Sequence, residues 1–177
     1  AGTRRTTVVD DLERSVGVIG DSITQEATPV LRSLLRSDGF STVEIDAERS
    51  RRIQVGSGTP RAGLLVLQDL LAAGFAPDAW VFALGTNDIG SYGTAEDFGE
   101  LIRSMLLLVP DTTPVVWVDT HLPDRLENCA LFNGELSTLM RARGMSKVAS
   151  WSAANAAPFE DLLRSDRIHP NERGRVV

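Results

Sequence analysis

Ser22, Asp166 and His169 are the residues of this chain whose types could combine in nucleophilic chemistry. A serine hydroxyl is a poor nucleophile until a base takes its proton, and histidine suits that role near neutral pH. Asp166 precedes His169 by three residues. On a tight loop, this spacing would let the carboxylate hold the imidazole from behind, so that its other nitrogen could meet Ser22.

The surroundings of Ser22 leave more than one interpretation open. The apolar run VGVI ends at Gly20-Asp21-Ser22 and a helical pattern follows, so Asp21 or Ser22 is expected to cap that helix. A phosphate site is disfavoured, because GVIGDS matches neither common glycine-rich motif and no lysine is near. As a nucleophile, Ser22 would lie at a helix N-terminus, whose N–H groups and dipole favour developing negative charge. Asn87 can present a side-chain amide to the same oxyanion.

Short β-branched runs alternate with longer helical patterns along the chain, which is typical of an α/β fold. Strands are predicted at residues 15–19, 42–45, 79–84, 114–119 and 147–151. Helices are predicted between them, at residues 24–36, 62–73, 95–108 and 130–143. This alternation implies right-handed crossovers and a parallel sheet that is covered on both faces.

Polar segments follow the first four predicted strands, at residues 20–22, 46–58, 85–88 and 120–121. In an open α/β sheet, ligands bind beyond the carboxyl ends of the strands. These segments are therefore expected to share one rim of the sheet. The longest irregular piece, residues 48–60, is rich in Arg, Ser and Gly, and a loop of that length in a compact domain is often functional.

The totals favour one soluble globular domain that spans residues 1–177, with 42% apolar and 24% charged residues. A net charge of −6 argues against nucleic acid or an anionic membrane surface as the main partner. The single cysteine, Cys129, excludes an internal disulfide framework, and two distant histidines make a poor zinc site. No apolar run approaches the roughly 20 residues of a membrane span. The N-terminal AGTRR lacks an apolar signal core.

Three tetrapeptides give the chain a specific likeness: GDSI at residues 20–23, GTND at 85–88 and DRIH at 166–169. In this order and at these strand ends, they resemble the SGNH hydrolase superfamily, also called GDSL esterases/lipases. The resemblance implies a flavodoxin-like three-layer α/β/α sandwich with a five-stranded parallel sheet. It also implies that Ser22 is the nucleophile, His169 the general base and Asp166 its orienting partner. The backbone N–H of Ser22 and the side chain of Asn87 would belong to the oxyanion hole, and no cofactor or metal is required.

The chain departs from the family pattern after the second predicted strand. The family usually places a glycine there, whose backbone N–H is the remaining oxyanion donor, but IDAERSRRIQVGSG has no glycine directly after the strand. Ser50 aligns with that position, and a backbone donor needs no particular side chain if the φ and ψ angles permit. Gly56 and Gly58, farther along the loop, are the alternative donors.

A narrower likeness concerns bacterial cell-envelope O-acetyltransferase and acetylesterase domains, carried by VEIDAERSRRI, LFNGEL and DRIHPNERG. It implies an acyl group on an envelope carbohydrate and favours an extracytoplasmic or secreted location. The family usually continues after HPNERG into a helix that packs on the sheet, so the final helix is expected to be truncated. The oligomeric state stays open.

We therefore predict a serine esterase that hydrolyses short-chain acyl esters of a small molecule or a carbohydrate, acetyl esters in particular. The chain length leaves room for short loops only, which favours a shallow site and small acyl groups. The alternatives are an O-acyltransferase that acts on an envelope carbohydrate and a non-catalytic carbohydrate-binding module with the same fold.

Several other residues are candidates for contact with substrate, each beside a plainer interpretation. Asp21 would cap or brace the turn, and Arg51 and Arg52 belong to an arginine-rich run that is more often a solvated loop. His121 follows the fourth predicted strand and would be a loop histidine near the substrate. Asn133 either braces the rim or lies on a helix face. Core packing is favoured over sugar stacking for Trp80, Trp117 and Trp151.

Overall fold

A computed structural model describes residues 13–155 and 162–176, so the N-terminal AGTRR considered above lies outside the described residues. The sheet has five parallel strands in the order β2-β1-β3-β4-β5. The strands are β1 (Arg14–Gly20), β2 (Phe40–Ala47), β3 (Ala79–Ala83), β4 (Val115–Val118) and β5 (Ser146–Ala149). The predicted parallel sheet is confirmed.

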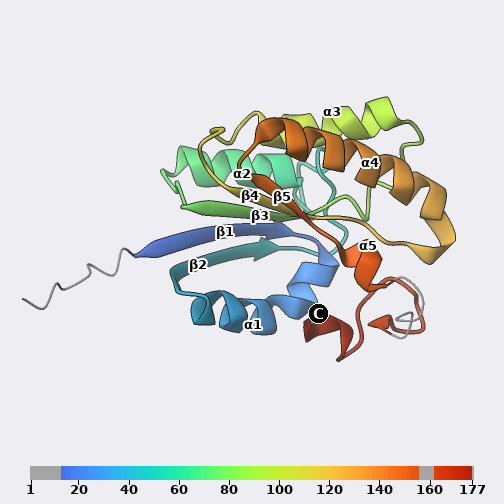
Figure 1. Ribbon diagram of the computed structural model, residues 1–177, viewed down its shortest axis with the longest axis horizontal. Coiled ribbons are helices and arrows are strands. Elements are labelled where there is room, and N and C mark those ends of the chain that lie inside the picture. The colour runs from blue at the N-terminus through green and yellow to red at the C-terminus, as the bar shows by residue number, and fades with distance from the viewer. Residues whose placement is uncertain (1–12, 156–161, 177) are drawn as a thin grey trace, which may run out of the picture.

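Helices cover both faces of the sheet, as Figure 1 shows. They are α1 (Ser22–Ser37), α2 (Gly63–Ala72), α3 (Ala95–Leu106), α4 (Leu126–Arg143) and the short α5 (Trp151–Ala154), with 3-10 turns η1 (Pro123–Arg125) and η3 (Gly174–Val176). α1 and the C-terminal segment lie on one face, whereas α2, α3 and α4 lie on the other (Figure 1). The three-layer α/β/α sandwich predicted from the sequence is confirmed.

The two faces of the sheet bury different amounts of apolar surface. The larger core lies under α2, α3 and α4 and contains fully buried aromatic side chains, among them Trp80, Phe82 and Trp117. A smaller core of Val16, Val18 and Val43 packs beneath α1. Burial on both faces explains why the central strands read as continuous apolar runs. The predictions that Trp80 and Trp117 pack in the core are confirmed.

Two helices begin earlier than the apolar periodicity indicates. α1 starts at Ser22, because Asp21 caps it, and α4 starts at Leu126 instead of residue 130. The 3-10 turn of Pro123–Arg125 leads directly into α4, so its first turn is set by the entering chain and not by an apolar face.

The order of the strands places the functional loops. β1 lies between β2 and β3, and the chain leaves β1 for α1 on one face but leaves β3 for α3 on the other. Such a reversal opens a crevice at the carboxyl ends of the two strands. Ser22 follows β1 and Asn87 follows β3, so both stand at this crevice. Among residues 13–155 and 162–176, no helix has the length and apolarity needed to cross a membrane.

Candidate active site

Ser22 is the first residue of α1, and the turn that carries it is tight. The Asp21 carboxylate accepts a hydrogen bond from the Ile23 N–H at 2.9 Å and so caps the helix. A Cβ at Gly20 would lie 2.3 Å from the Thr24 side chain, so only glycine fits before the cap. The Ser22 N–H belongs to the first turn of α1, where backbone donors have no acceptor within the helix.

His169 and Asp166 meet Ser22 in one hydrogen-bonded chain. The Nε2 of His169 lies 2.9 Å from the Oγ of Ser22, and its Nδ1 lies 2.8 Å from an oxygen of Asp166. An ionised carboxylate can only accept, so Nδ1 carries the proton in this pair. The Nε2 of the neutral ring then accepts from the serine hydroxyl, which is the arrangement that a general base requires.

Asp166 is held in the ionised form by the loop itself. Its second oxygen accepts from the backbone N–H groups of Ile168 and His169, each at 3.0 Å. The Ile168 N–H, the His169 N–H and the imidazole together lower the pKa of the Asp166 carboxyl to about 2. The carboxylate therefore stays charged throughout the neutral pH range.

The loop that carries this pair is shaped by its own backbone. Leu163 and Pro170 form an antiparallel bridge, the Arg164 N–H donates to the His169 carbonyl at 2.8 Å, and Arg167 has a φ of 58°. These contacts close the chain into a tight turn with Asp166 and His169 on one side. With three residues from Asp166 to His169, the carboxylate reaches the Nδ1 side of the imidazole, as expected from the sequence.

Asn87 is bound to Asp21, the residue before Ser22, and to the loop after β2. Its Nδ2 donates to the Asp21 carboxylate at 3.3 Å and to the Arg51 carbonyl at 3.1 Å. The preceding turn depends on Gly85, which has a φ of 127° and whose Cβ would lie 2.5 Å from the Phe132 ring. The side-chain amide is thus held at the crevice by β1, the loop after β2 and the turn after β3.

Two buried carboxyl groups lie under this part of the site. Asp21 is 1% exposed and Asp88 is 0% exposed, and Asp88 accepts from the Ile53 N–H at 3.1 Å. Burial raises the pKa of the Asp21 carboxyl to about 6 and that of Asp88 to about 7. Through its bond to the Ile53 N–H, Asp88 joins the turn after β3 to the loop after β2.

Ser50 adopts the backbone conformation of a glycine. Its φ is 61°, in the left-handed region that side chains rarely occupy, and the Arg51 N–H closes the turn by donating to the Glu48 carbonyl. Gly56 has a φ of 124°, and its Cβ would lie 2.4 Å from the Pro60 carbonyl oxygen, so its freedom serves the packing of the loop. Gly58 is exposed in the same loop.

The expectation that Arg51 contacts the substrate does not fit the structure. The side chain is 2% exposed, and its guanidinium donates to the Arg61, Gly20 and Asp46 carbonyls and to the carboxylates of Asp46 and Glu48. Arg51 instead ties the loop after β2 to the end of β1. The positive charge of Arg51 is paired within the fold, because three backbone carbonyls and two carboxylates accept hydrogen bonds from its guanidinium.

The other residues predicted to contact the substrate also differ in burial and in hydrogen bonding. Asp21 caps α1 and is almost fully buried, which fits bracing of the turn and not contact with the substrate. Arg52 and His121 are half-buried at the rim, after β2 and β4 respectively. Asn133 braces the rim: its amide exchanges hydrogen bonds with the backbone N–H and carbonyl of Thr120 at 2.9 Å each.

Glu26 is a contact of this site that the sequence did not single out. Its carboxylate pairs with Arg164 at 2.5 Å and with Arg175 at 3.3 Å. The available signal was its position four residues after Ser22, since residues at that separation share a helix face. The two arginines are far away in the sequence, so their pairing could not be read from it.

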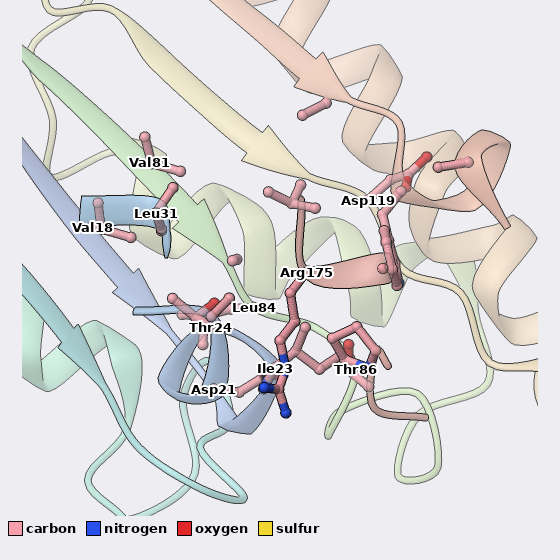
Figure 2. Close-up of a pocket in the computed structure, with 18 of the residues that line it drawn as sticks. Val18, Asp21, Ile23, Thr24, Leu31, Val81, Leu84, Thr86, Asp119 and Arg175 are labelled. Atoms are coloured by element: carbon pink, nitrogen blue, oxygen red, sulfur yellow. Dashed lines mark hydrogen bonds between the residues drawn. The ribbon is translucent and has the colours of Figure 1, made fainter. Parts of the chain in front are cut away.

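An apolar groove of 320 Å³ lies next to the site, on the face of the sheet that carries α1. Val18 and Val81 of the sheet and Leu31 of α1 line it, and Asp21 and Arg175 stand at its end nearest the crevice (Figure 2). Of the described residues that line the groove, none belongs to the Ser22–His169–Asp166 chain. No group of three or more His, Cys, Asp or Glu side chains within 13–155 and 162–176 is placed to hold a metal ion.

Solved structures of known proteins share this fold. The chain is 18% identical to TesA, covers 92% of each chain and superimposes with a TM-score of 0.69. It is 18% identical to the C-terminal catalytic domain of the Streptococcus pneumoniae peptidoglycan O-acetyltransferase A, with 92% and 87% coverage and a TM-score of 0.71. For the SGNH-hydrolase family esterase AlinE4 the identity is 20%, the coverage 92% and 88%, and the TM-score 0.68.

The sequence itself also matches a family. A comparison with curated protein sequences finds no match. In contrast, a family model described as GDSL-like lipase/acylhydrolase matches residues 18–176, which include Ser22, Asn87, Asp166 and His169. The protein therefore belongs to the GDSL-like lipase/acylhydrolase family and is a serine hydrolase of the SGNH/GDSL type.

Proposed function

We propose that this protein hydrolyses short-chain acyl esters, acetyl esters in particular, through an acyl-enzyme on Ser22. The observation that carries the proposal is the hydrogen-bonded chain from the Ser22 hydroxyl through His169 to the ionised Asp166. A binding module of the same fold would have no use for a serine, an imidazole and a carboxylate in this geometry.

In the first step, the Ser22 oxygen attacks the ester carbonyl and His169 takes the hydroxyl proton at Nε2. Asp166 stabilises the imidazolium that forms, and it stays ionised. The tetrahedral intermediate then breaks its bond to the leaving alcohol, which takes the proton from Nε2. The acyl group is now esterified to Ser22 and the imidazole is neutral again.

The developing oxyanion would be stabilised by three donors. The Ser22 N–H lies in the first turn of α1, whose dipole favours negative charge. The Asn87 amide at the same crevice would exchange one of its bonds to Asp21 and the Arg51 carbonyl for a bond to the oxyanion. The Ser50 N–H is the third donor, supported by the glycine-like backbone of this residue. The main-chain N–H of Gly56 or Gly58 is the weaker choice, since the Gly56 conformation is already required by Pro60.

In the second step, water attacks the acyl-enzyme while His169 again serves as base at Nε2. The tetrahedral intermediate collapses, the acid leaves, and the proton returns to the Ser22 oxygen. Support for a small acyl group comes from two of the segments at the rim, which are short: Asp21 alone separates β1 from α1, and residues 119–122 separate β4 from η1. These two loops leave their side of the site shallow.

Transfer of the acyl group to a carbohydrate hydroxyl is the second candidate function. It is favoured by the likeness to the catalytic domain of a peptidoglycan O-acetyltransferase, which has the highest TM-score among the structures compared above, 0.71. The acyl-enzyme would be the same, and a sugar hydroxyl would replace water as the nucleophile that attacks it.

The experiment is hydrolysis of p-nitrophenyl acetate, butyrate and octanoate by the wild type and Ser22→Ala. Activity that falls with acyl length and disappears in the variant would support the esterase. Equal rates in both proteins, together with no labelling of Ser22 by a fluorophosphonate, would overturn it. Added peptidoglycan oligosaccharides separate the second candidate, because an acyltransferase would yield an acetylated sugar in place of free acetate.

A further inference from the structure

We infer that Glu26 is a positioning residue that docks the loop of Asp166 and His169 onto the helix of Ser22. The inference rests on the proposed function, since it assigns Glu26 a role in aligning that same triad. We define the docked segment as residues 164–175, which begins and ends with the two arginines that contact Glu26.

The contacts of Glu26 reach both ends of this segment. Arg164 donates from its two terminal nitrogens to the two carboxylate oxygens, at 2.5 Å and 3.4 Å. Arg175 donates to one of these oxygens at 3.3 Å. A fork-to-fork pair such as that of Arg164 fixes orientation as well as distance. One carboxylate therefore holds the segment before Asp166 and after His169.

Glu26 also stands on the side of α1 that carries the nucleophile. It follows Ser22 by four residues, about one helical turn, so both side chains project from the same face. Figure 1 shows the C-terminal segment beside α1, and Figure 2 shows Arg175 close to the first turn of that helix. We call Glu26, Arg164 and Arg175 the clamp. It links the segment that carries His169 to α1, the helix that carries Ser22.

The segment's own hydrogen bonds do not set its place relative to α1. The Leu163–Pro170 bridge and the bond between the Arg164 N–H and the His169 carbonyl shape the loop from within. The 2.9 Å contact of His169 with Ser22 needs the whole loop at one distance from α1. A misplacement of about 1 Å in a catalytic group costs about 100-fold in rate.

Partial burial separates this clamp from an ordinary surface ion pair. The side chains of Glu26, Arg175 and Arg164 are 20%, 30% and 38% exposed. Loss of the carboxylate would leave two guanidinium groups side by side without their shared anion. By contrast, Arg167 of the same segment pairs with Asp124 at 3.0 Å, but these side chains are 60% and 76% exposed. Such exposed pairs contribute little.

The experiment compares Glu26→Gln with the matched control Asp124→Asn, which removes the exposed ion pair of the same segment. We expect Glu26→Gln to lower kcat by about 10- to 100-fold, with KM changed by less than about threefold. Labelling of Ser22 by a fluorophosphonate should slow by the same factor as kcat. Asp124→Asn should match the wild type in all three measurements.

Hydrogen exchange provides a readout that does not depend on activity. Faster exchange of amides in residues 164–175 in Glu26→Gln, but not in Asp124→Asn, is expected if Glu26 docks the segment. If Glu26→Gln does not fold, Arg164→Lys keeps the charge, loses the fork geometry and should still reduce kcat several-fold. A folded Glu26→Gln with wild-type kcat and exchange would overturn the inference. Wild-type protein that cleaves no ester and equals Ser22→Ala would overturn the proposed function instead, with the exchange result still standing.

Discussion

At the scale of single residues, donors and acceptors of the site are paired with one another within the protein. Asp21 and the Arg51 carbonyl both accept from the Asn87 amide, at 3.3 Å and 3.1 Å, so both of its hydrogens are paired and its place at the crevice is fixed. To serve an oxyanion, the amide would exchange one of these bonds for a bond to the substrate oxygen. Buried Asp21 and Arg51 therefore act on the chemistry through Asn87.

The first prediction concerns this amide. Asn87→Ala should lower kcat by about 10²–10³-fold and leave KM nearly unchanged, because one oxyanion donor acts mainly in the transition state. Steady-state hydrolysis of p-nitrophenyl acetate measures both constants. Ser22→Ala should lose more than Asn87→Ala. An Asn87→Ala enzyme with wild-type kcat would remove Asn87 from the oxyanion hole.

Ser50 permits a test that separates its backbone from its side chain. Ser50→Gly keeps the N–H and suits the φ of 61°, so kcat with p-nitrophenyl acetate should be retained. Thermal unfolding should show little change, since relief of the strained conformation offsets the greater chain entropy of glycine. A loss of kcat as large as that of Asn87→Ala would mean that the serine hydroxyl, and not the backbone, contributes to the site.

At the scale of elements, the turns after the strands hold the chemistry, and glycine decides whether they close. Gly85→Ala would require an L residue at a φ of 127° and a methyl group 2.5 Å from the Phe132 ring. Strain and overpacking of this kind each cost about 1–3 kcal/mol. We expect lower stability in urea unfolding and a lower kcat, because Asn87 lies two residues farther along the same turn.

Gly90→Ala is the matched control for this prediction. Gly90 follows the same turn, but a Cβ there meets nothing within 4 Å. The variant should therefore unfold at the same urea concentration as the wild type and keep its kcat. Equal losses in the two variants would show that this part of the chain tolerates no side chain at all, so the clash with Phe132 would not be the cause.

The elements also show what a sequence can predict. Strands such as β3 and the helices facing the larger core follow from continuous apolar runs and from 3.6-residue periodicity. The proximity of Ser22 to Asn87 follows from the rule for carboxyl strand ends. The burial of Arg51 and the pairing of Glu26 with Arg164 and Arg175 do not follow, because they depend on where distant loops meet. Polar residues of one type look alike in sequence whether they face solvent or a neighbouring carboxylate.

At the scale of the whole molecule, the site is placed over two carboxyl groups that the fold keeps away from water. Asp21 and Asp88 are both buried, and each connects loops that follow different strands. Buried carboxyl groups bind protons more tightly in the folded state than in the unfolded chain. Catalysis and stability are thereby linked through pH, because the same two groups brace the crevice and resist ionisation.

The last prediction follows from this link. The pKa values of Asp21 and Asp88 rise from 3.8 to about 6 and about 7, so between these values the folded state holds more protons than the unfolded state. The free energy of unfolding should therefore be highest at low pH within this window and fall as the pH rises from about 4 to about 7. Asp166 acts in the opposite direction, but below pH 4, because its pKa is lowered to about 2.

Urea unfolding of Asp88→Asn over pH 4–8 tests this link. The asparagine cannot ionise and still offers an oxygen to the Ile53 N–H, so the free energy of unfolding should fall less steeply with pH than in the wild type. Glu100→Gln, an exposed position on α3, should keep the wild-type slope. Equal slopes for Asp88→Asn and the wild type would show that Asp88 does not carry this pH dependence.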